Sequence, residues 1–173
     1  MIGDRWGVSD EEVGSSFPCD QWIETPTMEA WRGVSVYTPA ADLWPWVTQV
    51  RLAPYSYDWI DNLGRRSPQD LRGLDEPKVG ENFTRAAGAR IGRILSVTPQ
   101  HQLTGRIAGA VISYVLVEQS SEGPRTRLLM KIVTDLTPLL ALPLGLGDLV
   151  MARRQLLNFK RLAESSQRDL TMH

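Results

Sequence analysis

The sequence predicts one α+β domain, in which an antiparallel sheet packs against one long helix. The chain has 173 residues, a length that suits a single domain. Residues 81–135 contain strand-like runs separated by turns. Residues 147–165 instead place apolar side chains three and four positions apart, as an amphipathic helix does. One sheet and one long helix form a two-layer domain.

Residues 1–30 are expected to form an N-terminal arm, followed by the domain at residues 31–165 and a tail at residues 166–173. In the arm, Ser9 and Glu12 have the spacing of a capping box and predict a short helix at residues 10–14. The first strand is expected at residues 31–37, where two sets of side chains alternate along the chain.

Short helices are predicted after this strand. Thr38 and Pro39 are typical of a helix start, and one apolar stripe follows them, made of Leu43, Trp46, Val47 and Val50. A second short helix is expected at residues 57–63, because Gly64 is a common residue just past a helix end.

The remaining strands are predicted at residues 81–86, 90–97, 101–107, 110–119 and 125–135. The turn Ser121-Glu122-Gly123-Pro124 joins the two longest runs into a hairpin. Connections this short make neighbouring strands antiparallel. With the strand at residues 31–37, the sheet is expected to have six strands.

The C-terminal helix is expected to bury one face, formed by Leu149, Ala152, Leu156, Phe159 and Ala163. The leucine-rich segment before it, residues 136–147, contains two prolines and two glycines, which predict a loop. Because so apolar a loop needs cover, we expect either a lid over a cavity or a homodimer contact, with a buried connection as the alternative.

Composition narrows the range of partners. The chain has 19 Lys and Arg against 20 Asp and Glu, so no basic excess indicates binding to nucleic acid or to an anionic membrane. Cys19 is the only cysteine and there are two histidines, so we expect neither a metal site nor a cofactor. The N-terminus lacks the pattern of a signal peptide, and no apolar run is long enough to span a bilayer, which predicts a cytoplasmic protein.

Two segments carry a family resemblance. Residues 53–68, APYSYDWIDNLGRRSP, and residues 5–13, RWGVSDEEV, resemble stretches of bacterial SRPBCC proteins. This superfamily includes START domains, pollen-allergen-like proteins and polyketide cyclases/dehydratases. The resemblance implies a helix-grip fold: a curved antiparallel sheet, commonly of seven strands, holds the C-terminal helix and leaves a cavity between them.

A cavity would need walls from both layers. The apolar pattern alone indicates ordinary core residues, whereas the resemblance implies that some of them line a pocket. The candidate wall residues are Tyr114, Val115, Val117, Leu128, Met130, Ile132, Leu149, Ala152 and Leu156. Tyr55, Tyr57, Asp58 and Trp59 offer aromatic surface and polar ends for a pocket mouth, or else pack their short helix onto the sheet.

Catalysis would need a positioned acid or base. Candidates are Tyr57, Asp58, Arg51, Arg106 and His101, with Arg106 also a candidate ligand contact, but no two have a spacing that implies cooperation. The leading hypothesis is therefore binding of a small hydrophobic molecule of lipid, polyketide or aromatic type. A cyclase or dehydratase using the same cavity is the alternative, and a dimerising interaction module without a ligand is a third.

Overall fold

The computed structural model describes residues 4–56, 64, 66–86, 88–119, 123–135 and 138–171, with side chains of the last helix described over residues 151–168. In chain order the elements are β1 (Arg5–Trp6), α1 (Asp10–Gly14), the 3-10 helix η1 (Pro18–Trp22), β2 (Met28–Val36), α2 (Ala40–Thr48), the 3-10 helix η2 (Gln49–Arg51), β3 (Thr84–Ala86), β4 (Ala89–Ile91), β5 (Arg93–Thr98), β6 (Gln102–Ile107), β7 (Ala110–Gln119), β8 (Arg125–Thr134) and α4 (Pro138–Thr171).

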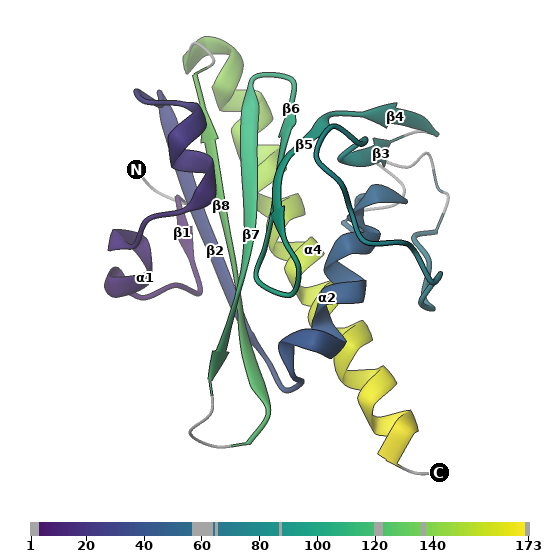
Figure 1. Ribbon diagram of the computed structural model, residues 1–173. Helices are drawn as coiled ribbons and strands as arrows, with labels where there is room; N and C mark the ends of the chain where they lie inside the picture. Colours follow the sequence, from purple (N-terminus) through teal and green to yellow (C-terminus); the bar gives the residue numbers. More distant parts are fainter. Residues whose placement is uncertain are drawn as a thin grey trace.

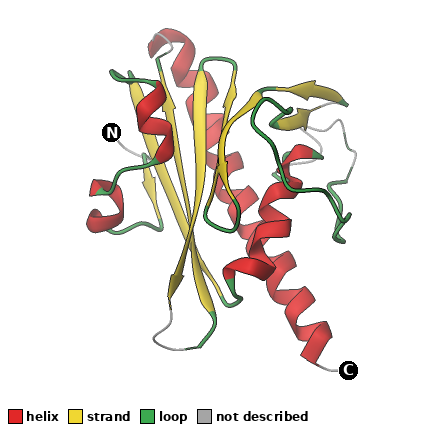
Figure 2. Ribbon diagram, viewed as in Figure 1, coloured by secondary structure: helices red, strands yellow, loops and turns green. Residues whose placement is uncertain are grey.

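The main sheet has the strand order β1-β2-β8-β7-β6-β5, and β3 and β4 form a separate two-stranded sheet. Every neighbouring pair in the main sheet is antiparallel except β1 and β2, which are parallel. Helices α2 and α4 lie on one side of this sheet, and the arm with α1 lies on the other (Figures 1 and 2). The predicted α+β class is confirmed.

Several strands differ from the prediction. The strand predicted at residues 81–86 begins at Thr84 and lies outside the main sheet, whose sixth strand is instead β1 of the arm. Strand β2 begins at Met28, three residues early, because its first residues continue the pairing with β8 as far as Met28 and Thr134. The run predicted at residues 90–97 is two strands, β4 and β5, separated by Gly92. This glycine has a φ of 71°, and a Cβ there would press against the Arg106 carbonyl oxygen and the Phe83 side chain.

The segment at residues 136–147 was predicted to be a loop, and this prediction is wrong for residues 138–147, which form the beginning of α4. Leucine and alanine are strong helix formers, Pro138 lies at the first helical position, and the two glycines cost only about 1 kcal/mol each. The side chains here lie outside the described part of the chain, so a lid or a subunit contact stays a prediction.

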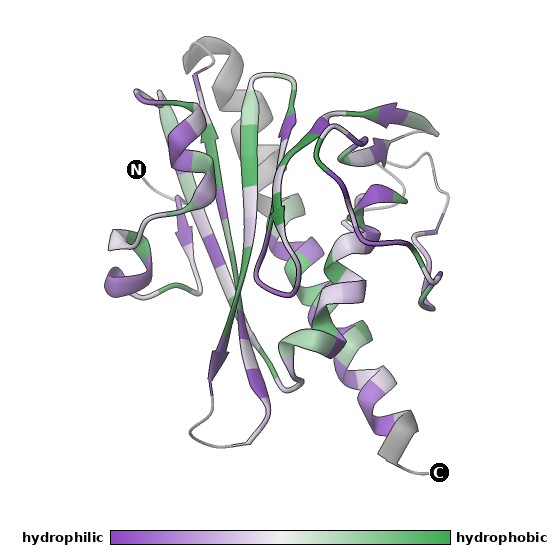
Figure 3. Ribbon diagram, in the orientation of Figure 1, coloured by the Kyte–Doolittle hydropathy of each residue, from purple (hydrophilic) through white to green (hydrophobic). Residues whose placement is uncertain are grey.

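The inner face of the sheet follows the alternation of the strands. On β7 and β8, Leu116 pairs with Leu128, Tyr114 with Met130, and Ile112 with Ile132, so these six side chains share one face. Hydrophobic residues recur along both strands (Figure 3). Val115 and Val117, which we predicted beside Tyr114 in the cavity wall, face the opposite side because neighbouring residues of a strand alternate.

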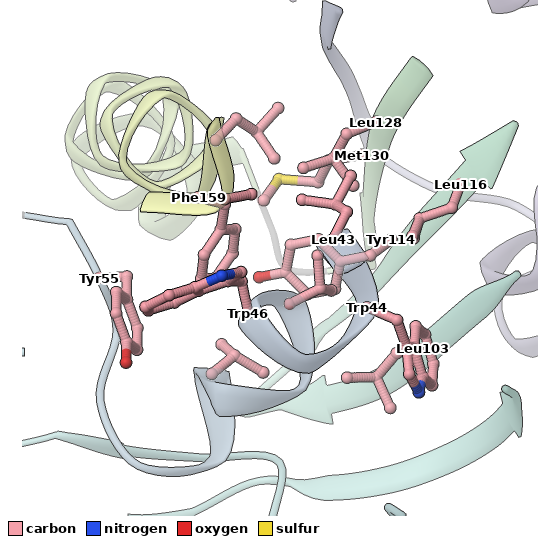
Figure 4. Close-up of a cluster of buried hydrophobic side chains, with 14 of the residues drawn as sticks. Leu43, Trp44, Trp46, Tyr55, Leu103, Tyr114, Leu116, Leu128, Met130 and Phe159 are labelled. Carbon is pink, nitrogen blue, oxygen red and sulfur yellow. The ribbon is translucent and has the colours of Figure 1, made fainter. Parts of the chain in front are cut away.

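Both helices bury the predicted faces against this inner surface. Leu43, Trp46, Val47 and Val50 are all buried, as are Ala152, Leu156, Phe159 and Ala163 of α4. Figure 4 shows this core, with Trp46 and Phe159 between the two layers. Among the described residues, no helix is long and apolar enough to cross a bilayer.

The arm covers the outer face of the sheet. Phe17 and Cys19 are buried there in a second apolar cluster with Trp31, Leu129 and Val133. This cover is held by ion pairs as well as by apolar contact. Arg127 grips Glu12 with two contacts, Nε to Oε1 at 2.6 Å and Nη2 to Oε2 at 2.9 Å.

A buried lysine on the outer face also depends on the arm. Lys131 is 5% exposed, and its Nζ lies 2.6 Å from Asp20 of the arm and 2.8 Å from Glu29. Burial alone would lower the pKa of Lys131, but the hydrogen bonds to Asp20 and Glu29 outweigh it and raise that pKa. The same ammonium lies 4.9 Å from the Trp31 ring. Removing the arm would therefore expose an apolar face and deprive a lysine of one of its partners.

The first prediction concerns the inner face of α4. Leu156 is fully buried, so Leu156→Ala should lower the free energy of unfolding by about 2–5 kcal/mol. Arg154→Ala, an exposed change two residues away, should cost less than about 0.5 kcal/mol. Urea titrations of both variants measure the two values, and equal small losses would contradict the assigned face.

The second prediction concerns the arm. The hydrogen bond from Arg127 lowers the pKa of Glu12 below its ordinary 4.5, against the opposing effect of burial. A lowered folded pKa stabilises the fold above about pH 4.5, and this contribution is lost as the pH falls through the folded value. Glu12→Gln should therefore lower the free energy of unfolding by roughly 1 kcal/mol at pH 7. The difference in this free energy between the variant and the wild type should become smaller below pH 4.5.

Thermal unfolding of both proteins between about pH 3 and 7, which includes the range where carboxylates titrate, tests this dependence. Glu11→Gln is the matched control, because Glu11 is an exposed neighbour in the same helix. A Glu12→Gln difference that stays constant with pH would show that the ion pair does not hold the arm.

Candidate functional site

A cavity of about 230 Å³ lies between the inner face of the sheet, α4 and the small β3–β4 sheet, and is open on one side. Its apolar walls are Val50, Pro54, Phe83, Ala86, Ile91, Ile107, Ile112, Met130, Ile132, Met151 and Ala152. Its polar lining residues are Ser56, Thr84, Tyr114 and Gln155. The wall is therefore mostly hydrocarbon with few polar groups, as in a small-molecule pocket.

A row of four aromatic rings, in tilted and edge-to-face contact, crosses the interior next to the cavity. The ring of Tyr55 lies 5.2 Å from that of Phe159, which lies 6.3 Å from Tyr114, which lies 6.2 Å from Phe83. Figure 4 shows Tyr55, Phe159 and Tyr114 at the centre of the packed region, with Trp46 among them. Since Tyr114 and Phe83 also line the cavity, this row of rings lies at the boundary between the packed core and the cavity.

The polar groups of the cavity are tied to the framework. Tyr114 donates its hydroxyl hydrogen to Gln155 Oε1 at 2.6 Å, and Gln155 Nε2 donates to the carbonyl of Pro54. Thr84 Oγ1 donates to the Val50 carbonyl at 2.7 Å. Ser56 is also engaged. These bonds join α4, the sheet and the segment after α2, so they hold the walls in place.

The predicted site residues that the structure describes lie in three places: the cavity wall, the adjoining core and the outer face of the sheet. Tyr114 and Met130 line the cavity, and Leu156 is buried in the adjoining core without reaching its wall. Tyr55 is 1% exposed within that core, where its hydroxyl accepts a 2.7 Å hydrogen bond from Gln49, so it does not form a pocket mouth. Arg106 is exposed on the outer face beside the arm, because it alternates with Gly105 and Ile107 of the inner face.

The other predicted contacts are not part of the described structure. Tyr57, Asp58 and Trp59, with the short helix predicted at residues 57–63, lie outside the described residues. Leu149 belongs to α4, but its side chain is likewise outside the described part. Their proposed roles stay predictions.

The candidate acid–base residues that are described do not meet at the cavity. Arg51 pairs with Glu81 at 3.2 Å, and His101 is exposed, with Nδ1 2.9 Å from the Pro99 carbonyl oxygen. Cys19 belongs to η1 of the arm and is buried against the sheet, and this burial raises the pKa of its thiol to about 11. Among the described wall residues there is no carboxylate, histidine, cysteine, lysine or arginine.

Metal binding finds no support in side-chain placement either. Over the described residues, no three of the His, Cys, Asp and Glu side chains gather in an arrangement that could hold a metal ion. The two carboxylates that do converge, Asp20 and Glu29, meet on the Lys131 ammonium.

Sequence reasoning missed Gln155, which shares the buried face of α4 with Ala152 and Phe159. The signal was present, since Gln155 is a polar residue inside an otherwise apolar stripe. It also missed Phe83 and the β3–β4 sheet as walls. Nothing in the sequence of those short strands indicates where they pack.

Phe83 is held in the wall by a glycine. Gly105 of β6 lies under the Phe83 ring, and a Cβ at this position would overlap the ring carbons. Phe83 is 1% exposed, so the ring has little room to move away. The missing side chain of Gly105 is therefore what allows an aromatic ring from outside the main sheet to close this part of the cavity.

A third prediction follows from this packing. Gly105→Ala should destabilise the protein by about 1–3 kcal/mol, the usual cost of overpacking a core. In a protein that already carries Phe83→Leu, Gly105→Ala should lower the free energy of unfolding by less than it does in the wild type, because the smaller side chain relieves the clash. Gly14→Ala is the control, because a Cβ there meets nothing within 4 Å. Additive losses in a double-mutant cycle would refute the contact.

Comparison with solved structures supports the architecture. Protein MLL2253 from Mesorhizobium loti aligns with a TM-score of 0.54 and 18% identity, over 79% of this chain and 97% of its own. XoxI from Bacillus cereus aligns with a TM-score of 0.51 and 10% identity, over 80% of this chain and 97% of XoxI. DynU16, from the dynemicin biosynthetic locus, aligns with a TM-score of 0.50 and 18% identity over 80% of this chain, which spans 48% of DynU16.

No protein-family model matches the sequence, and no curated protein matches it. At these identities the structural matches establish the fold and leave the ligand open. The observed fold agrees with them: an antiparallel sheet order β2-β8-β7-β6-β5 is crossed on its inner face by a long C-terminal helix. The chain therefore has the helix-grip fold that was expected from the sequence.

Proposed function

We propose that this protein binds a small, largely apolar organic molecule in the cavity between the sheet and α4. The observation that carries this proposal is an apolar hollow in an otherwise well-packed core. An apolar ligand that enters this open hollow removes hydrocarbon wall from water and makes dispersion contacts with it, and both effects favour binding.

The volume sets the size of the ligand. An engineered apolar cavity of about 150 Å³ accepts benzene, whereas pockets for drug-sized molecules begin at about 300 Å³. At about 230 Å³, this cavity suits one or two aromatic rings, or a short aliphatic chain. A sterol would need the walls to move apart.

Binding is favoured over catalysis on chemical grounds. A cyclase or dehydratase needs a group that moves a proton, and Tyr114 is the one ionisable side chain among the described wall residues. Its hydroxyl already donates to Gln155. Binding an apolar molecule, by contrast, requires only the hydrocarbon wall. An interaction module with a filled core fits less well, because the core is not filled.

A fourth prediction tests the cavity. A compound that binds only the folded protein stabilises it by about 2.7 kcal/mol at a hundredfold excess over its Kd. A thermal-unfolding screen of one- and two-ring aromatics, short-chain alcohols and sterols should yield stabilisers in the first two classes. Met130→Trp should fold but lose this stabilisation, because Met130 is buried in the cavity wall and a larger side chain fills the space.

Val117→Trp is the matched control, since it adds the same side chain to the outer face of the neighbouring strand. It should leave the ligand response unchanged. If no compound shifts the transition and Met130→Trp unfolds the protein, the interior behaves as solid core and the proposal fails.

A further inference from the structure

We infer that Gln155 selects the ligand: the cavity takes an uncharged, mostly apolar molecule that carries one hydroxyl or similar neutral group, which binds the Gln155 amide. This inference rests on the proposed function and adds the chemical class of the ligand. Three observations support it: the orientation of the amide, its unused bonding capacity and the absence of charge in the described wall.

The partners of Gln155 determine which way its amide points. The Pro54 carbonyl can only accept a hydrogen bond, so the NH2 group of Gln155 must face it. The amide oxygen then faces Tyr114, whose hydroxyl donates to it at 2.6 Å. The reverse orientation would set the amide oxygen against the carbonyl oxygen of Pro54, which is repulsive.

This arrangement leaves half of the amide's capacity unused. A glutamine amide has two N–H donors and two acceptor lone pairs, and the contacts to Pro54 and Tyr114 use one of each. Within the described part of the chain, no further partner of Gln155 is present. The residue is 8% exposed and lines the cavity, so a partner for the remaining N–H and lone pair would have to come from the cavity.

A hydroxyl group matches this remaining capacity. It can accept from the second N–H or donate to the second lone pair, whereas a hydrocarbon can do neither. The rest of the molecule would lie against the isoleucine and methionine walls. The ligand is thus oriented, with its polar end at α4.

The described part of the wall disfavours a charged ligand. A carboxylate ligand would need a cation, and the described lining offers none. Arg32 faces the same side of the sheet as Met130, its pairing partner, but it does not line the cavity, and its Nη1 donates to the carbonyls of Asp4 at 2.8 Å and Trp31 at 2.6 Å. A cationic ligand would likewise meet no described carboxylate in the wall.

Three probes of matched shape test the inference: naphthalene, 2-naphthol and 2-naphthoate. With the full-length protein, 2-naphthol should bind about 2- to 10-fold more tightly than naphthalene, as expected for one net hydrogen bond. Binding of 2-naphthoate should be at least about 100-fold weaker than that of 2-naphthol, because its charge would be buried unpaired. Dissociation constants from equilibrium dialysis at neutral pH measure both ratios.

The variant Gln155→Met keeps the length of the side chain and removes the amide. It should bind naphthalene as well as the wild type does and lose the preference for 2-naphthol. Retained naphthalene binding also shows that the variant is folded. Asn158→Met is the control, because Asn158 donates to the Tyr55 carbonyl from the same helix without lining the cavity; it should keep the preference.

The outcomes separate this inference from the proposed function. If naphthalene and 2-naphthol bind equally, or if Gln155→Met keeps the preference, Gln155 does not select the ligand, while the cavity still binds apolar molecules. Tighter binding of 2-naphthoate than of 2-naphthol overturns the neutral class. If none of the three probes binds the wild type, the proposed function fails together with the inference.

Discussion

Strand β8 and the first half of β7 are covered on both faces, and this double burial determines what must surround them. Tyr114, Leu128 and Met130 face α2 and α4, whereas Val111 and Leu129 lie in the apolar cluster under the arm. A sheet with two apolar faces needs a layer on each side. The helices therefore cover one face and the N-terminal arm the other, which makes the arm part of the fold.

The outer layer is held by charge as much as by apolar contact. Lys131 and Arg127 both project from β8 into the outer face, and the arm supplies Asp20 and Glu12 as their partners. A buried lysine without a carboxylate would cost several kcal/mol, so the arm and the sheet depend on each other. Among its described residues, the inner layer has no such ion pairs at the cavity. It is joined instead by neutral hydrogen bonds through Gln155 and Thr84.

The inner layer also divides into a solid part and a hollow part. Around Leu43, Leu128 and Leu156 the side chains from α2, α4 and the sheet fill the interior, whereas at Ile112 and Ile132 they do not meet. The row of rings from Tyr55 to Phe83 stands at this border. The rings are stiff, and the hydroxyls of Tyr55 and Tyr114 are hydrogen-bonded to Gln49 and Gln155, so this border is well defined beside the hollow.

The sequence by itself determined the order of elements, the buried faces of α2 and α4, and the capping box of α1, because these depend on spacing along one helix or strand. It could not determine which strand face turns inward, so Val115 and Val117 were predicted in a wall that they do not form. Arg106 was predicted as a ligand contact, although it lies on the outer face. It also did not predict the helical form of residues 138–147, where local leucine propensity and the proline and glycine signals compete. The cavity itself was decided by tertiary packing. Gln155, Phe83 and Gly105 come together from three separate segments, and a hollow is defined by side chains that fail to meet, which no local pattern records.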